Sequence, residues 1–385
     1  MATLAQAAMP QQAPESLTEL MRSSPARSPL THGLLLLNLL MFMAMLSQGA
    51  GLWHTANGVP LAWGANFGPA TQDGQWWRLF TATFIHFGVV HLGMNLWALR
   101  DVGRLVERLY GPWRFATLYV ASGILGNLLS LVVQGNQAVS GGASGAIFGL
   151  YVALLVFLWR ERRQVMPSEF RWLFGGASVF TVLMLGMGWV IPGIDNAAHC
   201  GGLLAGALLA QVSARPWMAH SPKNRLSQGL ALLVLLAGSG WLAGHIPAPS
   251  YLFHEELKAR EAIQNFTLAD QRITQQWGEI LNTAPRQRLT FEQLAGRIES
   301  TVTAGYEHSF EQLVAATPES QAPSAAALGS LQAYALQRAQ SSRDLADGLR
   351  TQDTEKIRQA LRQAQKTVSA ASQALAPRSA ASAGQ

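Results

Sequence analysis

The sequence is poor in cysteine and in charge. Cys200 is the only cysteine among 385 residues, so the chain has no intrachain disulfide framework. Charged residues make up 13% of the chain and apolar residues 49%, a balance that is unusual for a soluble protein. The formal net charge is +6, but the surplus Lys and Arg lie in short segments between apolar runs. We therefore interpret the charge as a sign of membrane orientation and not of nucleic-acid binding.

The first residues also lack the pattern of a secretory signal. Residues 1–28 are rich in Ala, Gln, Ser and Pro. They have neither the basic start nor the apolar core of a signal peptide. We expect a disordered cytoplasmic tail in this segment.

The chain does contain long apolar runs, and the first of them is long enough to cross roughly 30 Å of hydrocarbon. They predict an all-α fold, with a polytopic transmembrane helix bundle over residues 29–247. Seven spans are expected, at about 33–51, 79–99, 115–133, 144–159, 172–191, 196–213 and 229–246.

From Ser250 onward, charges are dense and apolar residues recur at helical spacing. This pattern predicts a soluble helical domain over residues 248–376, followed by a disordered tail at 377–385. Within this domain, the run at about 325–376 is compatible with either one long helix or a helical hairpin.

Basic residues are distributed unevenly between the loops of the bundle. Almost all of them lie after the second, fourth and sixth predicted spans, and Arg78 is the exception. Because loops rich in Lys and Arg face the cytoplasm, the N-terminus is expected to be cytoplasmic. The domain after the seventh span is then extracytoplasmic.

Five polar side chains interrupt the second, fourth and sixth spans: His86, His91, Asn95, Ser144 and His199. Each is costly in lipid, so all should face the protein interior. The predicted topology places all five in the outer half of the bundle. His91 and Asn95 are four residues apart and share one helical face.

A glycine pair begins within three residues of each of two of these polar residues. Ser144 precedes one pair and His199 precedes the other; the pairs are Gly145 with Gly149, and Gly202 with Gly206. Faces without side chains let two helices approach closely. Close packing would bring Ser144 within hydrogen-bond reach of His199, the arrangement of a nucleophile and its general base. His91, Asn95 and the Ser144 backbone N–H are candidate donors for an oxyanion.

Simpler interpretations exist for these residues. Ser144 and its glycines, taken alone, are typical of a helix-packing motif, and His199 could be satisfied by a backbone carbonyl. Asp195 could orient the imidazole as a triad acid, or it or Asn196 could cap the sixth span. Cys200 lies about 100° around the helix from His199, which argues against a cysteine mechanism. Asn127, in the third span, is interpreted as an interhelical hydrogen-bonding residue.

Four motifs in this order resemble those of the rhomboid family of intramembrane serine proteases. They are Trp77-Arg78, His86-x4-His91-x3-Asn95, Gly142-Ala143-Ser144-Gly145 and Ala198-His199-x2-Gly202-x3-Gly206. The resemblance covers about residues 30–215, and the seventh span matches the six-plus-one arrangement of many rhomboids. It implies Ser144 as nucleophile, His199 as base, and His91, Asn95 and the Ser144 N–H as oxyanion hole.

The resemblance also implies supporting roles. His86 would help to hold the water-accessible cavity and the first loop, and Trp77 and Arg78 would hold that loop in place. Gly142 would leave room for a substrate carbonyl beside the serine. One position departs from the family: Phe148 stands where many members have a Tyr whose ring packs against the catalytic histidine. The stacking face is retained and the hydroxyl is lost.

The function expected from the resemblance is a serine endopeptidase that cleaves transmembrane segments of other proteins near the outer face of the bilayer. Transmembrane protein substrates and the lipid bilayer are the expected partners, with no metal, cofactor or nucleic acid. The bacterial inner membrane is the expected location. The alternative is an inactive rhomboid-like protein that binds transmembrane helices, although such proteins usually lack the serine or the histidine. A small-solute transporter would show repeat symmetry between its halves, which this sequence does not.

Overall fold

The computed structural model describes Ser16 and residues 28–213, 225–319 and 321–375. These residues form helices and no strand, apart from an isolated bridge between Asn66 and Ser140, so the predicted all-α class is confirmed. The chain divides into two units, residues 1–249 and 250–385. The tails predicted at 1–28 and 377–385 lie outside the described residues, apart from Ser16 and Ser28.

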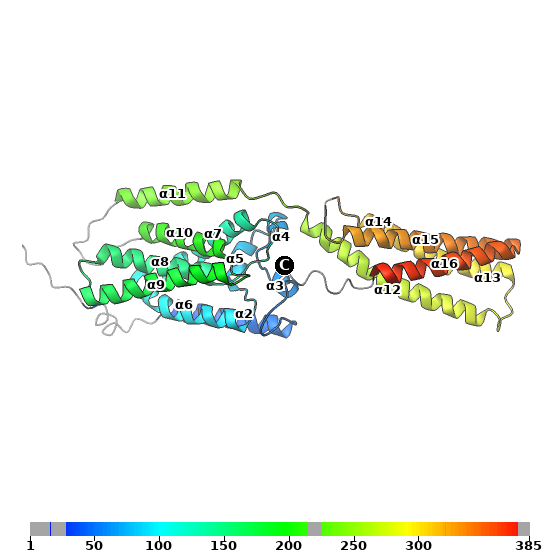
Figure 1. The fold of residues 1–385 in the computed structure, drawn as a ribbon, viewed down its shortest axis with the longest axis horizontal. Helices are drawn as coiled ribbons and strands as arrows, with labels where there is room; N and C mark the ends of the chain where they lie inside the picture. Colours follow the sequence, from blue (N-terminus) through cyan, green and yellow to red (C-terminus); the bar gives the residue numbers. More distant parts are fainter. Residues whose placement is uncertain (1–15, 17–27, 214–224, 320, 376–385) are drawn as a thin grey trace, which may run out of the picture. The chain divides into compact units, whose positions relative to one another are not determined.

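Among the described residues of the first unit there are seven longer helices, which can be followed in Figure 1. They are α2 (Pro29–Ser47), α6 (Val89–Tyr110), α7 (Pro112–Gln134), α8 (Ser144–Glu161), α9 (Pro167–Val190), α10 (Asn196–Val212) and α11 (Arg225–Gly244). Four short helical segments connect α2 to α6: α3 (Gly58–Ala62), α4 (Gly68–Gln72), α5 (Arg78–Thr81) and η1 (Ala82–Phe84). At the centre, α7, α8 and α10 pack against one another.

Five of the described helices, α2, α7, α8, α9 and α11, are long and apolar enough to cross a membrane. The segment Arg78–Phe84 together with α6 makes a sixth candidate, bent by 92°. Helix α10 has 17 residues and lies within the predicted sixth span. The number of crossings and their direction stay predictions.

The predicted second span, 79–99, is wrong in its helix bounds. The continuous helix α6 begins at Val89 and ends at Tyr110, so His86 lies before it. The chain breaks because the loop after α2 bonds to the backbone there. The Val89 N–H donates to the Leu52 carbonyl oxygen at 2.8 Å, and the Thr55 N–H to that of Phe87 at 3.0 Å.

The two glycine pairs meet where α8 packs on α10. A Cβ on Gly202 would collide with the carbonyl oxygen of Gly145, and a Cβ on Gly206 would collide with the Cα of Gly149. Helix α7 approaches α10 as closely, since a Cβ on Gly126 would lie 2.6 Å from the Ala198 carbonyl oxygen. These three backbones therefore tolerate no side chain at their contacts.

A buried carboxylate joins α2 to α6. Glu107 is 3% exposed and accepts from the N–H of Leu30 at 3.0 Å, the N–H of Thr31 at 2.8 Å and the Thr31 hydroxyl at 2.7 Å. The first N–H groups of a helix have no intrahelical partner and carry partial positive charge. Glu107 thus satisfies the N-terminus of α2 and fixes its position along α6.

The second unit is a helical bundle with its own apolar core. It consists of α12 (Phe253–Thr283), α13 (Phe291–Ile298), the π-helical turn η2 (Glu299–Thr303), α14 (Ala304–Ala315), α15 (Ala325–Thr351) and α16 (Thr354–Leu375). Of the two possibilities for the run at 325–376, the structure shows the hairpin. Gln352 takes a left-handed conformation, with φ of 56°, and α16 packs back against α15.

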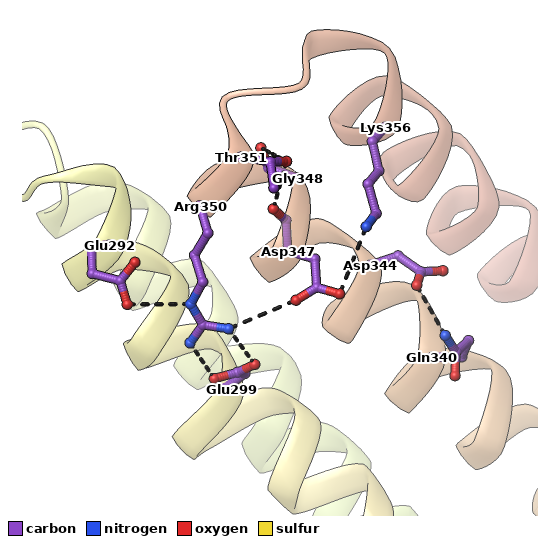
Figure 2. A network of polar contacts seen from close by, with 9 residues as sticks. All are labelled: Glu292, Glu299, Gln340, Asp344, Asp347, Gly348, Arg350, Thr351 and Lys356. Atoms are coloured by element: carbon purple, nitrogen blue, oxygen red, sulfur yellow. Dashed lines mark hydrogen bonds and ion pairs between the residues drawn. The ribbon is translucent and has the colours of Figure 1, made fainter.

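An ionic cluster joins α13 and η2 to α15 (Figure 2). The Arg350 guanidinium donates to both oxygens of Glu299, at 2.7 and 2.5 Å, and to Glu292 at 3.2 Å. On the same helix, Asp347 lies 3.8 Å from Arg350 and 3.7 Å from Lys356 of α16. The hydrogen bonds from Arg350 lower the pKa of the Glu299 carboxyl.

This cluster should give the second unit an acid-dependent stability. The pKa of Glu299 is lower in the folded protein than the value of about 4.3 of an unfolded chain. The contribution is therefore complete above that value and is lost as the pH falls through the folded pKa. We expect Glu299→Gln to lower the thermal unfolding midpoint at pH 7, and the difference from the wild type to disappear once acid protonates Glu299 in the folded protein. Circular dichroism checks this, with Glu311→Gln, outside the cluster, as control; a difference that persists in acid would contradict it.

The glycine contact gives a second prediction. Gly206→Val should lower the free energy of unfolding by about 1–3 kcal/mol, because the new side chain meets the backbone of α8. Gly186→Val is the control, since a Cβ at Gly186 has no neighbouring atom within 4 Å. Thermal unfolding in detergent measures both, and equal midpoints for the two variants would contradict the tight contact.

Candidate active site

Ser144 and His199 lie at the beginning of two neighbouring helices. Ser144 is the first residue of α8, and His199 lies in the first turn of α10. His199 Nε2 is 2.8 Å from Ser144 Oγ. The imidazole is buried, at 7% exposure, and its Nδ1 has no hydrogen-bond partner among the described residues. The pair expected from the glycine spacing is thus within hydrogen-bond distance.

Phe148 restrains the imidazole from one side. Its ring centroid lies 4.4 Å from that of His199, with the planes 35° apart. Phe148 follows Ser144 by about one turn of α8, so it faces the same way as the serine. The ring contact expected at this position is present, and the side chain brings no hydroxyl.

His91 lies beside the chain that leads into Ser144. Gly142 has a φ of +140°, and a Cβ there would lie 2.9 Å from both Cε1 and Nε2 of the His91 ring. Both the conformation and the contact require glycine. The neighbouring Asn95 donates its Nδ2–H to the main-chain oxygen of His91 at 2.9 Å. One Nδ2–H of Asn95 therefore remains for another acceptor.

His86 is fully buried outside α6 and packs on His91. The ring centroids are 5.0 Å apart at an interplanar angle of 61°. His86 Nδ1 lies 3.3 Å from the Phe84 carbonyl oxygen. His86 therefore supports the His91 ring, and it does not contact Ser144 or His199 through any described hydrogen bond.

Arg78 holds the loop between α2 and α6 from inside. It is 3% exposed and donates to the carbonyl oxygens of Leu61 at 2.7 Å and Ala65 at 3.0 Å. Its guanidinium carbon lies 4.8 Å from the centre of the Trp77 ring. Arg78 thus bonds to the loop and lies against Trp77, and the role of the two residues in holding the loop stays a prediction.

Asparagines attach the same loop to α7. Asn127 donates to the Leu79 carbonyl oxygen at 2.8 Å, and Asn66 donates to that of Asn127 at 2.9 Å. Asn66 and Ser140 exchange two backbone hydrogen bonds of 2.8 Å each. The loop, α7 and the segment before Ser144 are therefore linked. The bond from Asn127 of α7 to Leu79 of α5 is the interhelical hydrogen bond that was expected.

The sequence left two roles open for Asp195, orientation of the imidazole or capping of α10, and the structure shows capping. Its Oδ1 accepts from the Ala198 N–H at 2.9 Å. Its Oδ2 accepts from the hydroxyls of Ser130 and Ser140, each at 2.5 Å. The two serines were not anticipated, and the only hint was a serine within an apolar span. Asp195 makes no described hydrogen bond to the His199 ring.

This arrangement can perform acyl transfer. A hydroxyl bonded to an imidazole is a nucleophile with its base in place, and the surrounding helices keep the pair within an apolar bundle. Among the described residues, no group of three or more His, Cys, Asp or Glu side chains is arranged to hold a metal ion.

Comparison with known proteins identifies the family. A family model described as a Rhomboid domain matches residues 73–216. "Rhomboid protease GluP" of Bacillus subtilis is 34% identical over 221 residues, which cover 57% of this chain and 41% of GluP. "Rhomboid-type serine protease 2" of Emericella nidulans is 34% identical over 168 residues, 41% of this chain and 32% of that protein.

The chain thus spans less than half the length of these two relatives, and the family model ends before the second unit begins. A third relative is matched over most of its length. "Putative rhomboid protease YdcA" of Bacillus subtilis is 33% identical over 170 residues, which cover 44% of this chain and 80% of YdcA. Because of this match and its apolar helices, we conclude that the chain is an integral membrane protein and belongs to the rhomboid family.

Proposed function

We propose that the protein is an intramembrane serine endopeptidase that hydrolyses peptide bonds in transmembrane segments of other membrane proteins. The observation that carries the proposal is the 2.8 Å contact between Ser144 Oγ and His199 Nε2 within a bundle of apolar helices. The printed names of the relatives, among them a rhomboid protease and a rhomboid-type serine protease, support it.

The reaction uses the two side chains in turn. His199 Nε2 accepts the hydroxyl proton as Ser144 Oγ attacks the scissile carbonyl carbon. The tetrahedral intermediate collapses when His199 gives this proton to the leaving amine, and an acyl ester on Ser144 remains. Water then attacks the ester while His199 accepts its proton, and His199 returns this proton to Ser144 Oγ as the ester bond breaks and the carboxyl product leaves. The imidazole ends each cycle in its starting state.

Charge that develops on the carbonyl oxygen needs donors beside Ser144. The proposed set is the Ser144 N–H, the free Nδ2–H of Asn95 and the His91 ring. His91 is held against Gly142, two residues before the serine. Donors fixed before the reaction stabilise an oxyanion without the cost of reorganising solvent.

Substrates must expose a peptide bond that a transmembrane helix normally keeps hydrogen-bonded. Gly and Pro weaken helices most strongly, and unsatisfied backbone groups are costly in lipid. We therefore infer that the preferred sites lie where small or helix-breaking residues let the substrate unwind near the outer face of the bilayer. The outer location follows from the positive-inside topology, with the N-terminus in the cytoplasm of a bacterial cell.

Loss of either member of the pair should abolish cleavage. We expect Ser144→Ala and His199→Ala to leave no measurable hydrolysis of a single-span substrate in liposomes, because no nucleophile or base replaces them. Cys200→Ala is the matched control, since Cys200 adjoins His199 on another face of α10 and should retain activity. Gel analysis of products, with fluorophosphonate labelling, measures this. Cleavage by either variant, or a wild type that binds helices without labelling, would overturn the proposal.

Asn95→Ala tests the oxyanion site separately. If Asn95 donates to the oxyanion, kcat should fall about 100- to 1000-fold with a smaller change in KM. Steady-state kinetics on the same substrate provides the measurement. An unchanged kcat would remove Asn95 from this role and leave the Ser144–His199 pair intact.

A further inference from the structure

Asp195 accepts more hydrogen bonds than a helix cap requires. One carboxylate oxygen, Oδ1, accepts from the Ala198 N–H at 2.9 Å, which is the capping bond itself. The other oxygen, Oδ2, accepts two short bonds of 2.5 Å from Ser130 and Ser140. Both serines are buried. The second oxygen is therefore bound to parts of the chain 65 and 55 residues away.

These partners come from the two segments that flank the catalytic pair. Ser130 lies on α7, the helix that packs on α10. Ser140 lies four residues before Ser144, and its backbone is paired with Asn66. Asp195 itself is the N-cap residue of α10, and its carbonyl oxygen accepts the backbone N–H of His199 at 3.2 Å. One carboxylate thus ties the segment that leads to the serine to the turn that bears the histidine.

The contact needs one oxygen that accepts from two hydroxyls, and a carboxylate oxygen can do so. An asparagine at this position would cap α10 about as well, because Asn and Asp are equivalent at the N-cap. Its amide nitrogen is a donor, however, and would face the hydroxyls of Ser130 and Ser140 without accepting from them both.

We propose that Asp195 is a positioning residue for the reaction, which fixes the separation of Ser144 and His199 by holding Ser140 and Ser130 on one oxygen. The inference rests on the proposed protease function. Asp195 does not touch the reacting atoms; it acts through the placement of the segments on which they lie.

The test compares Asp195→Asn with variants of its partner Ser140 in the full chain, reconstituted in liposomes. Since a displacement of about 1 Å can cost on the order of 100-fold in rate, we expect Asp195→Asn to lower kcat about 10- to 100-fold, with KM nearly unchanged. The rate of fluorophosphonate labelling, which needs no docked substrate, should fall in parallel. Ser140→Ala should show a smaller loss of the same kind, and Ser140→Thr, which keeps the hydroxyl, should retain wild-type kcat.

The matched control is Ser239→Ala on α11, whose hydroxyl donates to the Leu235 carbonyl oxygen of its own helix. It should cleave and label as the wild type does. Thermal unfolding midpoints of all variants separate misplacement from unfolding, and those of Asp195→Asn and the wild type should be close.

Two outcomes would overturn the inference alone. An Asp195→Asn variant with wild-type kcat and labelling would make Asp195 a cap and nothing more. The role of Asp195 would be structural if two results were found together. The variants would lose kcat in proportion to their loss of unfolding midpoint, and Ser140→Thr would have a kcat as low as that of Ser140→Ala. A wild type that neither cleaves nor labels would instead overturn the proposed function, and the inference with it.

Discussion

The close approach of three backbones is the constraint on which the site depends. Packing of α8 on α10 places Gly202 against Gly145 and Gly206 against Gly149, with no space for a Cβ. Within a bilayer, helices gain little from burying apolar surface, so such contacts supply much of the association through packing. Ser144 directly precedes Gly145, and His199 lies three residues before Gly202, so the helix separation sets the distance between Ser144 and His199. A hydrogen bond of 2.8 Å would not survive the displacement that even one added methyl group requires.

The orientation of His199 depends on packing more than on a partner for its second nitrogen. A triad acid would normally hold the imidazole through Nδ1, but here that atom has no partner in the described part of the chain. The ring is instead confined by Phe148, at 4.4 Å, and by the rigid first turn of α10. Asp195, the nearest candidate acid in sequence, uses its oxygens on Ala198, Ser130 and Ser140. The contact with Phe148 and the capped first turn of α10 therefore orient the imidazole, as a carboxylate does in a triad.

Long apolar runs were sufficient to predict the all-α class, and glycines at helical spacing were sufficient to predict the approach of Ser144 to His199. The break before α6 could not be predicted, since the apolar run continues through it and the bonds from Leu52 and Thr55 come from a distant loop. The bonds of Asp195 were missed for the same reason: its serine partners are far away in sequence. The turn between α15 and α16 uses Gln352 in a left-handed conformation, for which a non-glycine residue gives no local signal.

Two helices begin at the site, and their N-termini are treated differently. The first N–H groups of any helix lack intrahelical partners and carry partial positive charge. On α10 the Asp195 carboxylate interacts with this charge and accepts a hydrogen bond from the Ala198 N–H. On α8 the cap position is Ala143, and no side chain caps the helix. A fixed carboxylate there would compete with an oxyanion for the Ser144 N–H, whereas an open N-terminus leaves that donor to the transient charge. The partial positive charge at a helix N-terminus thus has two uses here. At α10 it binds the Asp195 carboxylate and fixes the helix that carries His199, and at α8, in the proposed reaction, it stabilises the intermediate formed on Ser144.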